Sequence, residues 1–505
     1  MILDHKSTNN DGKIRTNMPD WSALMPVLPE AGRRTPALYR ELRRLIETGA
    51  VPPGSKLPPS RDLARRLKTS RGSVVAAFET LIAEGYAVAR TGAGTFVADR
   101  VPILKPAAPI AAESSEPKAP LPGTLGVAMA DARTLGLFRT LMARHLARPG
   151  PEHFSYGDAR GSIGLREAVA AYLRQARGVR CEARSVVITT GTQQGIDLFI
   201  RTALSPGDRV MIEDPCYPSA RAAFSGNSLA VSGLAVDGEG ADIARAVPGG
   251  RAVYVTPSHQ FPLGVTMSMR RRLALIDWAR ETGGWIVEDD YDSEFRFAGP
   301  PLAAMQGMDD SGRVVYLGTF SKVLFPGLRL GYAVLPDALL EPLVALRARS
   351  DRGPPTLPEA ALADLLREGH FAAHLRRARR RAEAARDALV AGLAVAGNLT
   401  VSIPDQGLHL VTGLPAALDD MTAVEMARAA GLGARALSAM AVTEPARQGL
   451  VVGFSGFAPE VLQAAAARFA AMAAKVQGRE KPGSFEPGLA TGIGAEEISG
   501  RRGSS

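Results

Sequence analysis

Apolar residues in the first hundred positions recur at the spacing of helices. Those of residues 37–48 fall on one helical face. Ser60 and Ser70 stand where a hydroxyl caps the start of two further helices. The second of these ends at Gly85 and is expected to bury one apolar face, made of Val74, Val75, Phe78, Leu81 and Ile82. Two helices joined by a short turn in this way predict a helix–turn–helix.

A hairpin follows these helices. Short apolar runs stand on both sides of the glycine-rich turn at 91–94, which predicts two antiparallel strands. Helix, helix–turn–helix and hairpin in this order make a winged helix, an α+β unit. We assign it to residues 33–98.

Between about residue 125 and residue 477, short apolar runs alternate with helical patterns. This alternation predicts an α/β domain with a mostly parallel sheet covered by helices. The runs are 186–191, 209–214, 252–257, 285–290 and 314–318. Because ligands of such sheets bind at the carboxyl ends of the strands, chemistry is expected in the residues that end or follow each run.

The remaining segments look like connections and ends. Residues 1–32 are a polar N-terminal extension, and residues 99–124, rich in Pro, Ala and Ser, are typical of a semi-rigid linker. Residues 478–505 are rich in Gly and Ser and have no apolar period, which predicts a disordered tail. The chain is thus predicted to be multidomain, with the large domain at 125–477.

Composition excludes several classes of protein. The chain has 505 residues, 46% apolar and 22% charged, as in an ordinary globular protein. No apolar run reaches the ~18–20 residues of a membrane span, and the polar first 20 residues hold no signal-peptide core. Cys181 and Cys216 are the two cysteines, too few for a disulfide framework, so a reducing cytoplasm is the expected location.

Charge is concentrated in the winged helix. Residues 33–98 hold 12 Lys and Arg against 5 Asp and Glu, whereas the whole chain has a net charge of +9. This asymmetry favours a module that binds a polyanion, with a solvated basic surface or a protein-binding winged helix as the alternatives. The start of a recognition helix and the tip of a wing are the expected DNA contacts. The residues that we place there are Arg61, Ser70, Arg71, Ser73, Gly92 and Gly94.

The sequence of residues 57–96 closely resembles the GntR family of bacterial transcription regulators. The turn, the helix cap and the glycine-rich wing all stand at the spacing of that family. The resemblance implies binding to a double-stranded DNA operator.

Three segments of the large domain carry candidate chemistry. Residues 190–199 combine a glycine and a hydroxyl at a helix start, which suits a phosphate. Residues 288–296 hold a dense group of carboxylates that Mg²⁺ can also use. Residues 319–332 place Lys322 among hydroxyl and apolar side chains, where it is either a salt-bridge partner or an amine able to form a Schiff base.

Together the three segments favour pyridoxal phosphate over a metal. A phosphate cradle, a carboxylate for the ring nitrogen, a tyrosine and a lysine are what this cofactor requires, and the metal alternative leaves the lysine and the cradle unexplained. The large domain resembles the fold-type I aminotransferases, and the whole chain resembles the MocR subfamily of GntR regulators. The segments that carry this resemblance are 154–173, 190–199, 212–221, 254–264, 288–296 and 318–332.

The resemblance implies a role for each site residue. Lys322 would form the Schiff base, Asp289 would pair with the pyridine nitrogen, Tyr291 would bind the ring hydroxyl, and Tyr217 would stack on the ring. Ser258 and His259 would line the ring edge. The phosphate would be held by Thr192, Gln193, Thr319, Ser321 and Arg329, with Tyr156 from a second subunit of a homodimer.

Two basic patterns on one predicted helix have alternative explanations. His370 and His374 stand four residues apart, a spacing that can bind zinc, but packing is favoured because a third ligand is not evident. The arginines of 376–381 are expected to form a solvated helix face rather than a second DNA contact.

We therefore expect a regulator of transcription that senses pyridoxal phosphate and an amino-acid or amine effector. One alternative is a working aminotransferase that carries a DNA-binding domain. Another is a DNA-binding protein whose cofactor domain is purely structural.

Overall fold

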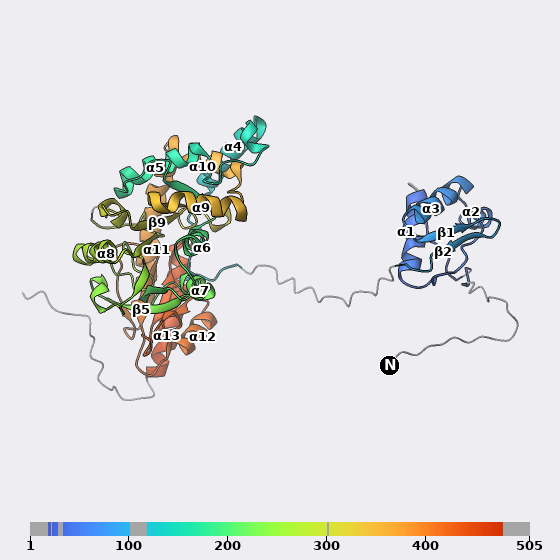
Figure 1. Ribbon diagram of the computed structural model, residues 1–505. Helices are drawn as coiled ribbons and strands as arrows, with labels where there is room; N and C mark the ends of the chain where they lie inside the picture. Colours follow the sequence, from blue (N-terminus) through green and yellow to red (C-terminus); the bar gives the residue numbers. More distant parts are fainter. Residues whose placement is uncertain (1–18, 22, 29–33, 102–118, 300–301, 478–505) are drawn as a thin grey trace, which may run out of the picture. The chain divides into compact units, whose positions relative to one another are not determined.

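The computed structural model describes residues 19–21, 23–28, 34–101, 119–299 and 302–477. The chain divides into two compact units, Met1–Lys118 and Ala119–Ser505 (Figure 1). The predicted tail, most of the predicted N-terminal extension and most of the predicted linker lie outside the described residues. Within the described part, no helix is long and apolar enough to cross a bilayer.

The small unit is a winged helix, as predicted. Its elements are α1 (Arg34–Glu47), α2 (Ser60–Arg66), α3 (Arg71–Ala83), β1 (Ala87–Arg90) and β2 (Gly94–Val97). The two strands pair antiparallel around the turn at 91–93. Its core joins the apolar face of α1 to that of α3 and to the hairpin, because Leu42, Phe78 and Val97 are all buried.

Of the two predicted helix caps, the one at Ser70 forms and the one at Ser60 does not. The Ser70 hydroxyl accepts the Ser73 backbone N–H at 3.0 Å, which confirms the cap of α3. Ser60 does not cap α2, because it is the first helical residue, and Pro59, at the N-cap position, has no side-chain acceptor. On α3, Ala77 is buried, whereas Val75 and Ile82 are only half-buried.

The small unit extends further toward the N-terminus than the expected boundary at residue 33. Trp21 is 8% exposed, packs into the winged-helix core and donates its indole N–H to the Lys56 carbonyl at 3.2 Å. Leu24, Met25 and Leu28 pack against the same core. An isolated aromatic residue outside any periodic pattern gives little sign of such packing.

An eight-stranded sheet forms the centre of the large unit. Its spatial order is β3 (Val186–Thr189), β10 (Gly331–Val334), β9 (Val314–Thr319), β8 (Trp285–Asp290), β7 (Gly250–Val255), β4 (Arg209–Asp214), β5 (Ala230–Asp237) and β6 (Gly240–Ala241). Strands β9, β8, β7, β4 and β5 are parallel, whereas β10 is antiparallel to both β3 and β9. Strand β3 therefore runs in the same direction as β9, and the predicted mostly parallel sheet is confirmed.

Helices cover both faces of this sheet. On one face the core includes residues of α6 (Thr192–Ala203), α7 (Pro218–Gly226) and α9 (Asp337–Ser350). The other face packs against α8 (Met269–Thr282) and α5 (Ile163–Arg177). Helices α4 (Ala132–Ala147) and α10 (Thr356–Arg367) lie with α5 at one end of the unit (Figure 1).

A second sheet closes the other end of the large unit. It has the order β11 (Thr400–Val401), β12 (His409–Gly413), β14 (Leu450–Gly453) and β13 (Arg435–Ala436), all antiparallel. Helices α11 (His370–Ala394), α12 (Asp420–Ala429) and α13 (Pro459–Gln477) contribute to the core beside it.

The first residues of the large unit belong to this end. The Gly433 N–H donates to the Pro122 carbonyl at 2.6 Å, and the Gly453 N–H donates to the Gly123 carbonyl at 2.8 Å. Residues 122–124, which the sequence assigns to the linker, are therefore packed, whereas residues 119–121 are exposed. Gly123 permits this approach, since a Cβ there would lie 2.3 Å from the Gly433 carbonyl.

Candidate cofactor site and nucleic-acid interface

The predicted site residues converge because their strands run in one direction. Strands β3, β4, β7, β8 and β9 end at the same edge of the sheet. Thr192 begins the helix after β3, Tyr217 follows β4, His259 follows β7, and Lys322 follows β9. The sheet thus brings together residues that are up to 130 positions apart, as expected for a ligand site of an α/β fold.

Lys322 lies in a half-buried turn just beyond β9. Burial lowers the pKa of its amine below the usual value, and the nearby carboxylates Asp292 and Asp289 oppose the shift. A lysine whose pKa is lowered in this way is a better nucleophile for an aldehyde than an ordinary lysine.

Asp289 is a buried carboxylate with one oxygen in use and one free. Its Oδ2 accepts the Tyr254 hydroxyl at 2.6 Å, while its Oδ1 has no hydrogen-bond partner among the described residues. Burial raises the pKa of Asp289 to about 7, and the Tyr254 hydrogen bond and the Lys322 charge oppose this shift. An unpaired buried carboxylate oxygen requires a donor, which a protonated ring nitrogen supplies.

The neighbouring acids are engaged elsewhere. Successive side chains of a strand point to opposite faces, so Glu288 and Asp290 lie on the face opposite to Asp289. Glu288 accepts the backbone N–H groups of Met305 and Gln306 at 2.9 and 3.0 Å. Asp290 accepts the Arg177 guanidinium at 2.8 Å. These three carboxylates therefore do not converge on one Mg²⁺ ion.

The start of α6 lies beside the start of β10. Gly191 precedes α6 with φ +118°, and a Cβ on Gly331 would come within 2.9 Å of the Gly191 Cα. Gly331 is also paired with Thr319 across β10 and β9. The first amides of α6, Thr319 and the chain near Arg329 thus share one region, where a helix N-terminus favours a phosphate.

The predicted phosphate ligands differ in how they are held. The Thr319 hydroxyl accepts the Ser321 N–H at 3.1 Å, and the Gln193 amide donates to the Ser219 carbonyl at 3.1 Å. Arg329 is exposed, makes no ion pair within the described residues and has φ +52°, a left-handed conformation that is uncommon outside glycine. Such backbone outliers cluster at functional sites.

Aromatic side chains and a histidine surround the ring region. Tyr217 packs edge-to-face on Phe261, with centroids 5.7 Å apart. The Tyr291 hydroxyl lies 3.0 Å from His259 Nδ1, which also contacts Asp292 at 2.9 Å. The Arg177 guanidinium donates to the Ser258 hydroxyl at 2.6 Å. The Ser258 side chain therefore belongs to the buried network that Arg177 forms with Asp290.

Tyr156 is not brought to this site within one chain. It is 80% exposed and lies under the guanidinium of Arg352, 4.5 Å from the ring centroid. Its predicted phosphate contact requires a second copy of the chain.

Sequence reasoning missed a glycine that touches the lysine. Gly126 has φ +76°, and a Cβ at this position would lie 2.7 Å from Lys322 Nζ. It belongs to the segment 119–130, which we call the strap. The strap is held by Pro122 and Gly123 as described above and by the Ala130 N–H, which donates to the Leu324 carbonyl at 3.0 Å. Only the tertiary structure shows this approach, because no local pattern marks Gly126.

One other group of side chains has the composition of a metal site. His259, Asp292 and His409 are buried, and their potential ligand atoms lie within 4.8 Å of one another. His409 is hydrogen-bonded to the Pro262 carbonyl at 3.0 Å, and His259 to Asp292. The predicted zinc alternative does not form, because His374 uses one ring nitrogen on Thr134 and the other on the Val323 carbonyl.

The arginines of 376–381 are not simply solvated. Arg377 pairs with Asp131 at 2.8 Å, and Arg379 and Arg381 donate to the backbone carbonyls of Glu294 and Met129. These side chains tie α11 to neighbouring segments, which corrects the expectation of a purely solvated helix face.

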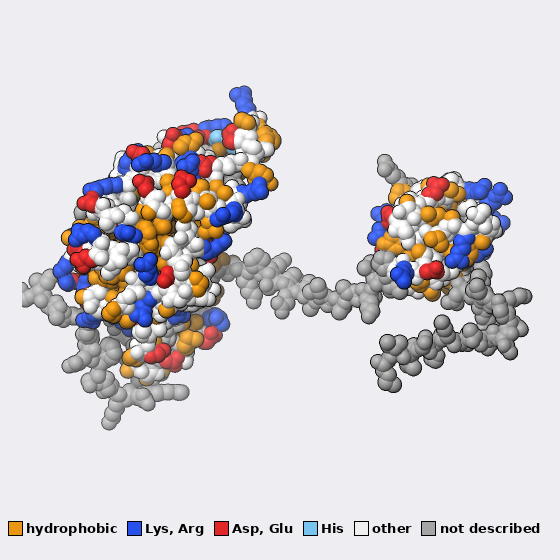
Figure 2. Space-filling model, in the orientation of Figure 1, with side chains coloured by type: hydrophobic (Ala, Val, Ile, Leu, Met, Phe, Trp, Pro, Cys, Tyr) orange, Lys and Arg blue, Asp and Glu red, His pale blue; other side chains and the backbone are white. Residues whose placement is uncertain are grey.

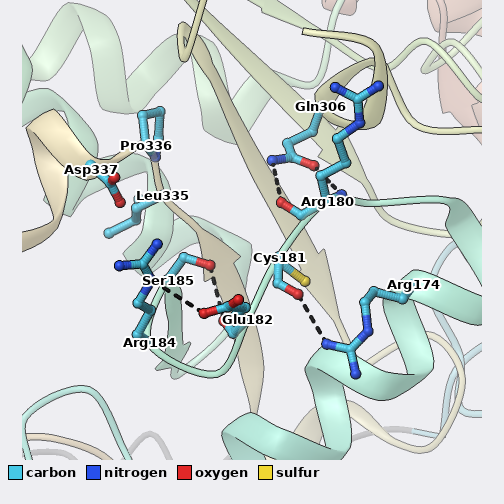
Figure 3. A pocket seen from close by; sticks show the side chains of 10 residues that line it. All are labelled: Arg174, Arg180, Cys181, Glu182, Arg184, Ser185, Gln306, Leu335, Pro336 and Asp337. Carbon is cyan, nitrogen blue, oxygen red and sulfur yellow. Dashed lines mark hydrogen bonds and ion pairs between the residues drawn. The ribbon is translucent and has the colours of Figure 1, made fainter. Parts of the chain in front are cut away.

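A depression of about 700 Å³ elsewhere in the large unit is a poor candidate for the cofactor (Figure 3). Its guanidinium groups are already engaged, since Arg174 donates to the Cys181 carbonyl at 3.0 Å and Arg184 lies 3.4 Å from Glu182. Its lining does not include Lys322 or Asp289.

The predicted DNA contacts lie at the surface of the small unit. Arg61, Ser70, Arg71, Gly92 and Gly94 are exposed, and Ser73 is half-exposed. Neither Arg61 nor Arg71 makes an ion pair within the described residues. Basic side chains gather on the side of the unit where α2 is drawn (Figures 1 and 2). The first turn of α3 is therefore open to a polyanion.

Lys56 and Arg90 add positive charge beside the wing. Their charged groups lie 5.7 and 4.5 Å from the centroid of the Phe96 ring. Lys56 also comes close to the wing tip, because a Cβ on Gly94 would lie 3.2 Å from its side chain.

Comparison with known families agrees with the division into a winged helix and a large α/β unit. Residues 134–468 match the model described as aminotransferase class I and II, and residues 35–97 match that described as bacterial regulatory proteins, gntR family. The chain is 35% identical to a probable rhizopine catabolism regulatory protein, MocR, of Rhizobium meliloti over 448 residues. The match covers 84% of this chain and 91% of that protein.

The chain belongs to the MocR-type regulators of the GntR family. Another relative in this family is the pyridoxine biosynthesis transcriptional regulator PdxR of Corynebacterium glutamicum. It is 32% identical over 84% of this chain and 93% of its own length.

Among solved structures, a kynurenine aminotransferase of Pyrococcus horikoshii is 25% identical, with a TM-score of 0.64. The match covers 72% of this chain and 90% of that one. The α-aminoadipate aminotransferase LysN of Thermus thermophilus is also 25% identical, with a TM-score of 0.65, and the match covers 71% and 93% of the two chains. The large unit of this MocR-type chain therefore has the aminotransferase fold.

The residues present fit pyridoxal phosphate. The free Asp289 oxygen suits a protonated ring nitrogen, Lys322 suits an aldehyde, and the start of α6 suits a phosphate. Family membership and this set of groups make pyridoxal phosphate the cofactor of the site.

Proposed function

We propose that this chain is a transcription regulator whose winged helix binds an operator and whose large unit senses pyridoxal phosphate. The main observation behind this proposal is a buried Asp289 oxygen that has no hydrogen-bond partner in the described part of the chain and lies close to an amine of lowered pKa. A site prepared for a cofactor in the same chain as a basic winged helix is what a cofactor-sensing regulator needs. As in other regulators, the expected location is the cytoplasm.

The roles of the side chains follow from their positions. When bound, pyridoxal phosphate supplies a reactive aldehyde and a ring nitrogen that can carry a proton. Lys322 provides the amine beside that aldehyde, Asp289 holds the proton on the ring nitrogen, and Tyr217 covers a ring face. Arg329 and the first amides of α6 hold the phosphate, because a guanidinium and a helix N-terminus both favour an anion.

DNA recognition is assigned to the first turn of α3 and to the wing. The exposed Arg71 and Arg61 would contact base edges or phosphates, and Ser70 would keep the helix start intact through its cap. The cap leaves further amides of the first turn for a phosphate.

The strap connects the surroundings of Lys322 to the linker along the chain. Gly126 lies against Lys322 Nζ, and eight residues before it the chain enters the segment that leads to the winged helix. A cofactor attached at Lys322 changes the group that Gly126 packs against. An effector alters operator affinity only if it binds one arrangement of the protein better than another.

We propose a homodimer on the basis of exposed apolar side chains at one end of the large unit. Leu135, Leu146, Phe154, Tyr156 and Ile163 lie on α4, on the loop after it and at the start of α5, and each is at least 46% exposed. A second copy that covers them would also bring Tyr156 to a phosphate. Light scattering on the wild type and on Phe154→Ser would test this, and an unchanged dimer in the variant would exclude this surface.

The test of the proposed function is a titration of pyridoxal phosphate into a protein–operator mixture at fixed salt. Footprinting on the DNA upstream of the chain's own gene supplies the operator. We expect operator affinity to change roughly 5–150-fold, the usual range of such coupling. Identical binding curves for the apo and the loaded protein would contradict the proposal and favour a purely structural cofactor domain. Multiple turnovers with amino and keto acids in the same preparation would favour the aminotransferase alternative.

A further inference from the structure

One histidine nitrogen lies between a carboxylate and the tyrosine that is expected to face the cofactor ring. His259 Nδ1 is 2.9 Å from one oxygen of the Asp292 carboxylate and 3.2 Å from the other. The Tyr291 hydroxyl lies 3.0 Å from the same nitrogen. His259 and Asp292 are each only 1% exposed, so solvent does not compete for these contacts.

The surroundings of the His259 ring assign its proton to Nδ1. A proton on Nδ1 has the Asp292 carboxylate as its acceptor, whereas a lone pair there would face two carboxylate oxygens. A proton on Nε2 would have no acceptor, since this buried atom has no hydrogen-bond partner among the described residues. Because a buried donor without an acceptor is costly, both the other tautomer and the charged ring are disfavoured.

The His259 ring is fixed in this orientation by close neighbours. A Cβ on Gly407 would overlap its Cε1, and a Cβ on Gly264 would lie 3.3 Å from its Nε2. The His409 ring packs beside it, with the two centroids 4.8 Å apart. Burial keeps the pKa of His409 well below the ordinary value, so this neighbour adds no positive charge. His259 Nδ1 is therefore held toward Asp292 and Tyr291.

A proton on His259 Nδ1 determines the direction in which Tyr291 donates. A ring nitrogen that carries a proton cannot accept another, so the Tyr291 hydroxyl cannot donate to it. This hydroxyl makes no other hydrogen bond within the described part of the chain, and its proton is therefore left for a ligand. Burial raises the pKa of Tyr291 well above its ordinary value, and nearby carboxylates add to this shift, so the side chain remains a donor. These carboxylates belong to Asp292, Asp289, Glu213 and Asp290.

We infer that Asp292 and His259 form a dyad that positions Tyr291, so that its hydroxyl donates to the ring oxygen of bound pyridoxal phosphate. His259 is thus a positioning residue, because it acts on the cofactor through Tyr291. This inference rests on the proposed function and deepens it. The dyad would set the pH at which the attached cofactor changes its state of protonation.

The expected direction of the effect follows from the charge on the ring oxygen. When the nitrogen that joins Lys322 to the cofactor loses its proton, the ring oxygen keeps its negative charge and needs another donor. A hydrogen bond from Tyr291 stabilises this deprotonated form and lowers the pKa of the joining nitrogen. The Asp292 charge acts in the opposite direction, since it raises the pKa of Lys322. Substitution of Asp292 would therefore mix two effects, and the test changes His259.

The experiment titrates the absorbance of the full-length protein loaded with pyridoxal phosphate, from about pH 5 to about pH 10, a range that spans the ordinary pKa values of histidine and tyrosine. EDTA is present, so that a metal ion on His259, Asp292 and His409 does not contribute. Tyr291→Phe should raise the midpoint by about one to two pH units, the effect of a hydrogen bond to a charged group. His259→Leu should raise it by about half a unit or more, but not beyond the shift of Tyr291→Phe.

A double variant separates positioning from an independent effect. In the Tyr291→Phe background, His259→Leu should not move the midpoint further, because its effect passes through the hydroxyl. His259→Asn should bring the midpoint back toward that of the wild type, since an amide N–H can replace Nδ1–H. An unchanged midpoint in His259→Leu, or additive shifts in the double variant, would overturn the inference.

The control is another histidine that pairs with an aspartate. His145 Nε2 lies 2.9 Å from Asp364 Oδ2, on helices α4 and α10 away from the site. His145→Leu should leave the midpoint unchanged, and an equal shift in the two leucine variants would overturn the inference.

A measurement on the wild type does not depend on the folding of a variant. Nitrogen-15 spectra of histidine-labelled protein distinguish the two ring nitrogens, and the signal missing in His259→Asn identifies His259. We expect the proton on Nδ1. A proton on Nε2 would overturn the inference.

The two proposals fail in different ways. A wild type that does not take up pyridoxal phosphate at Lys322 would contradict the proposed function. Normal uptake of the cofactor, with a titration that does not respond to His259, would contradict this inference alone.

Discussion

The two units handle charge in opposite ways. In the winged helix, acids pair with arginines, as Glu41 does with Arg44 and Glu47 with Arg43. The hydrogen bond from Arg44 lowers the pKa of Glu41, and those from Tyr86 and Arg43 lower the pKa of Glu47. In the large unit, several acids are buried in addition to those in surface pairs, and burial raises the pKa of Glu213, Asp289 and Glu359 to about 7. One unit therefore presents charge outward to a long polyanion, and the other holds it inside around a small molecule.

This contrast has a physical cause. A surface that binds DNA works through many exposed cations, whose effect is screened by salt. A cofactor site works through a few groups in a region of low dielectric, where each interaction is stronger and each unpaired group costs more. The predictions below change one group at a time in either unit.

The largest effect is expected at Lys322. Lys322→Ala should lose all covalent attachment of pyridoxal phosphate, because no other amine is held in the site by the contacts described above. The measurement is borohydride reduction followed by peptide mapping. Lys475→Ala, an exposed lysine on α13, is the control and should keep full attachment. Label on a peptide without Lys322 in the wild type would show that the site assignment is wrong.

Buried carboxylates should make the large unit less stable as the pH rises. In the unfolded chain such groups lose their protons near pH 4, whereas in the folded apo protein they keep them to about pH 7. The native state therefore binds more protons in this window, so their contribution to stability is present below about pH 4 and lost toward pH 7. Between pH 5 and 7 we expect the unfolding midpoint to fall by several degrees.

The large unit can be followed by its own tryptophans. A Trp21→Phe background leaves Trp278 and Trp285, both in the large unit, as the fluorescent reporters. Glu213→Gln should flatten the pH dependence, because it removes one of the protonated carboxyls without a change of shape. A midpoint that rises from pH 5 to pH 7 would contradict the buried, protonated state.

In the small unit, Arg71→Ala should cost about 1–3 kcal/mol of operator binding if Arg71 reads a base, with relaxed specificity at one position. If it contacts only phosphate, the loss should be uniform across sequences, with a shallower salt dependence. Arg65→Ala is the matched control, because Arg65 is exposed on α2 but pairs with Asp62. Equal losses in the two variants would argue against a special role of the first turn of α3.

The smallest expected effect concerns the strap. Gly126→Ala adds a Cβ against Lys322 Nζ and should weaken cofactor attachment by roughly tenfold, about 1.4 kcal/mol. Gly397 also has a positive φ, +64° against +76° for Gly126, but has open space around it. Gly397→Ala should therefore cost only the backbone strain and leave cofactor attachment unchanged. Equal cofactor attachment in the two variants would contradict the contact between strap and lysine.

Local signals were sufficient for the winged helix. Its helices carry their own apolar faces, and glycines mark the wing. The Ser70 cap joins residues only three positions apart. Patterns of short range therefore determined the order of the elements. Packing at longer range decided the rest of this unit. Trp21 reaches the core from outside any periodic segment, and Ser60 stands inside α2 because Pro59 already occupies the position before the helix.

In the large unit the sequence determined which segments end strands and which residue types stand there, since strand runs and the polar residues after them are local features. The tertiary structure decided which of these groups face the cofactor. The pleat of β8 separates Asp289 from Glu288 and Asp290. Asp289 lies on the face near Lys322. On the opposite face, Asp290 pairs with Arg177, and Glu288 accepts backbone amides. Gly126 comes to the site through its approach to Lys322, about 200 residues away, and no local pattern encodes contacts of that length.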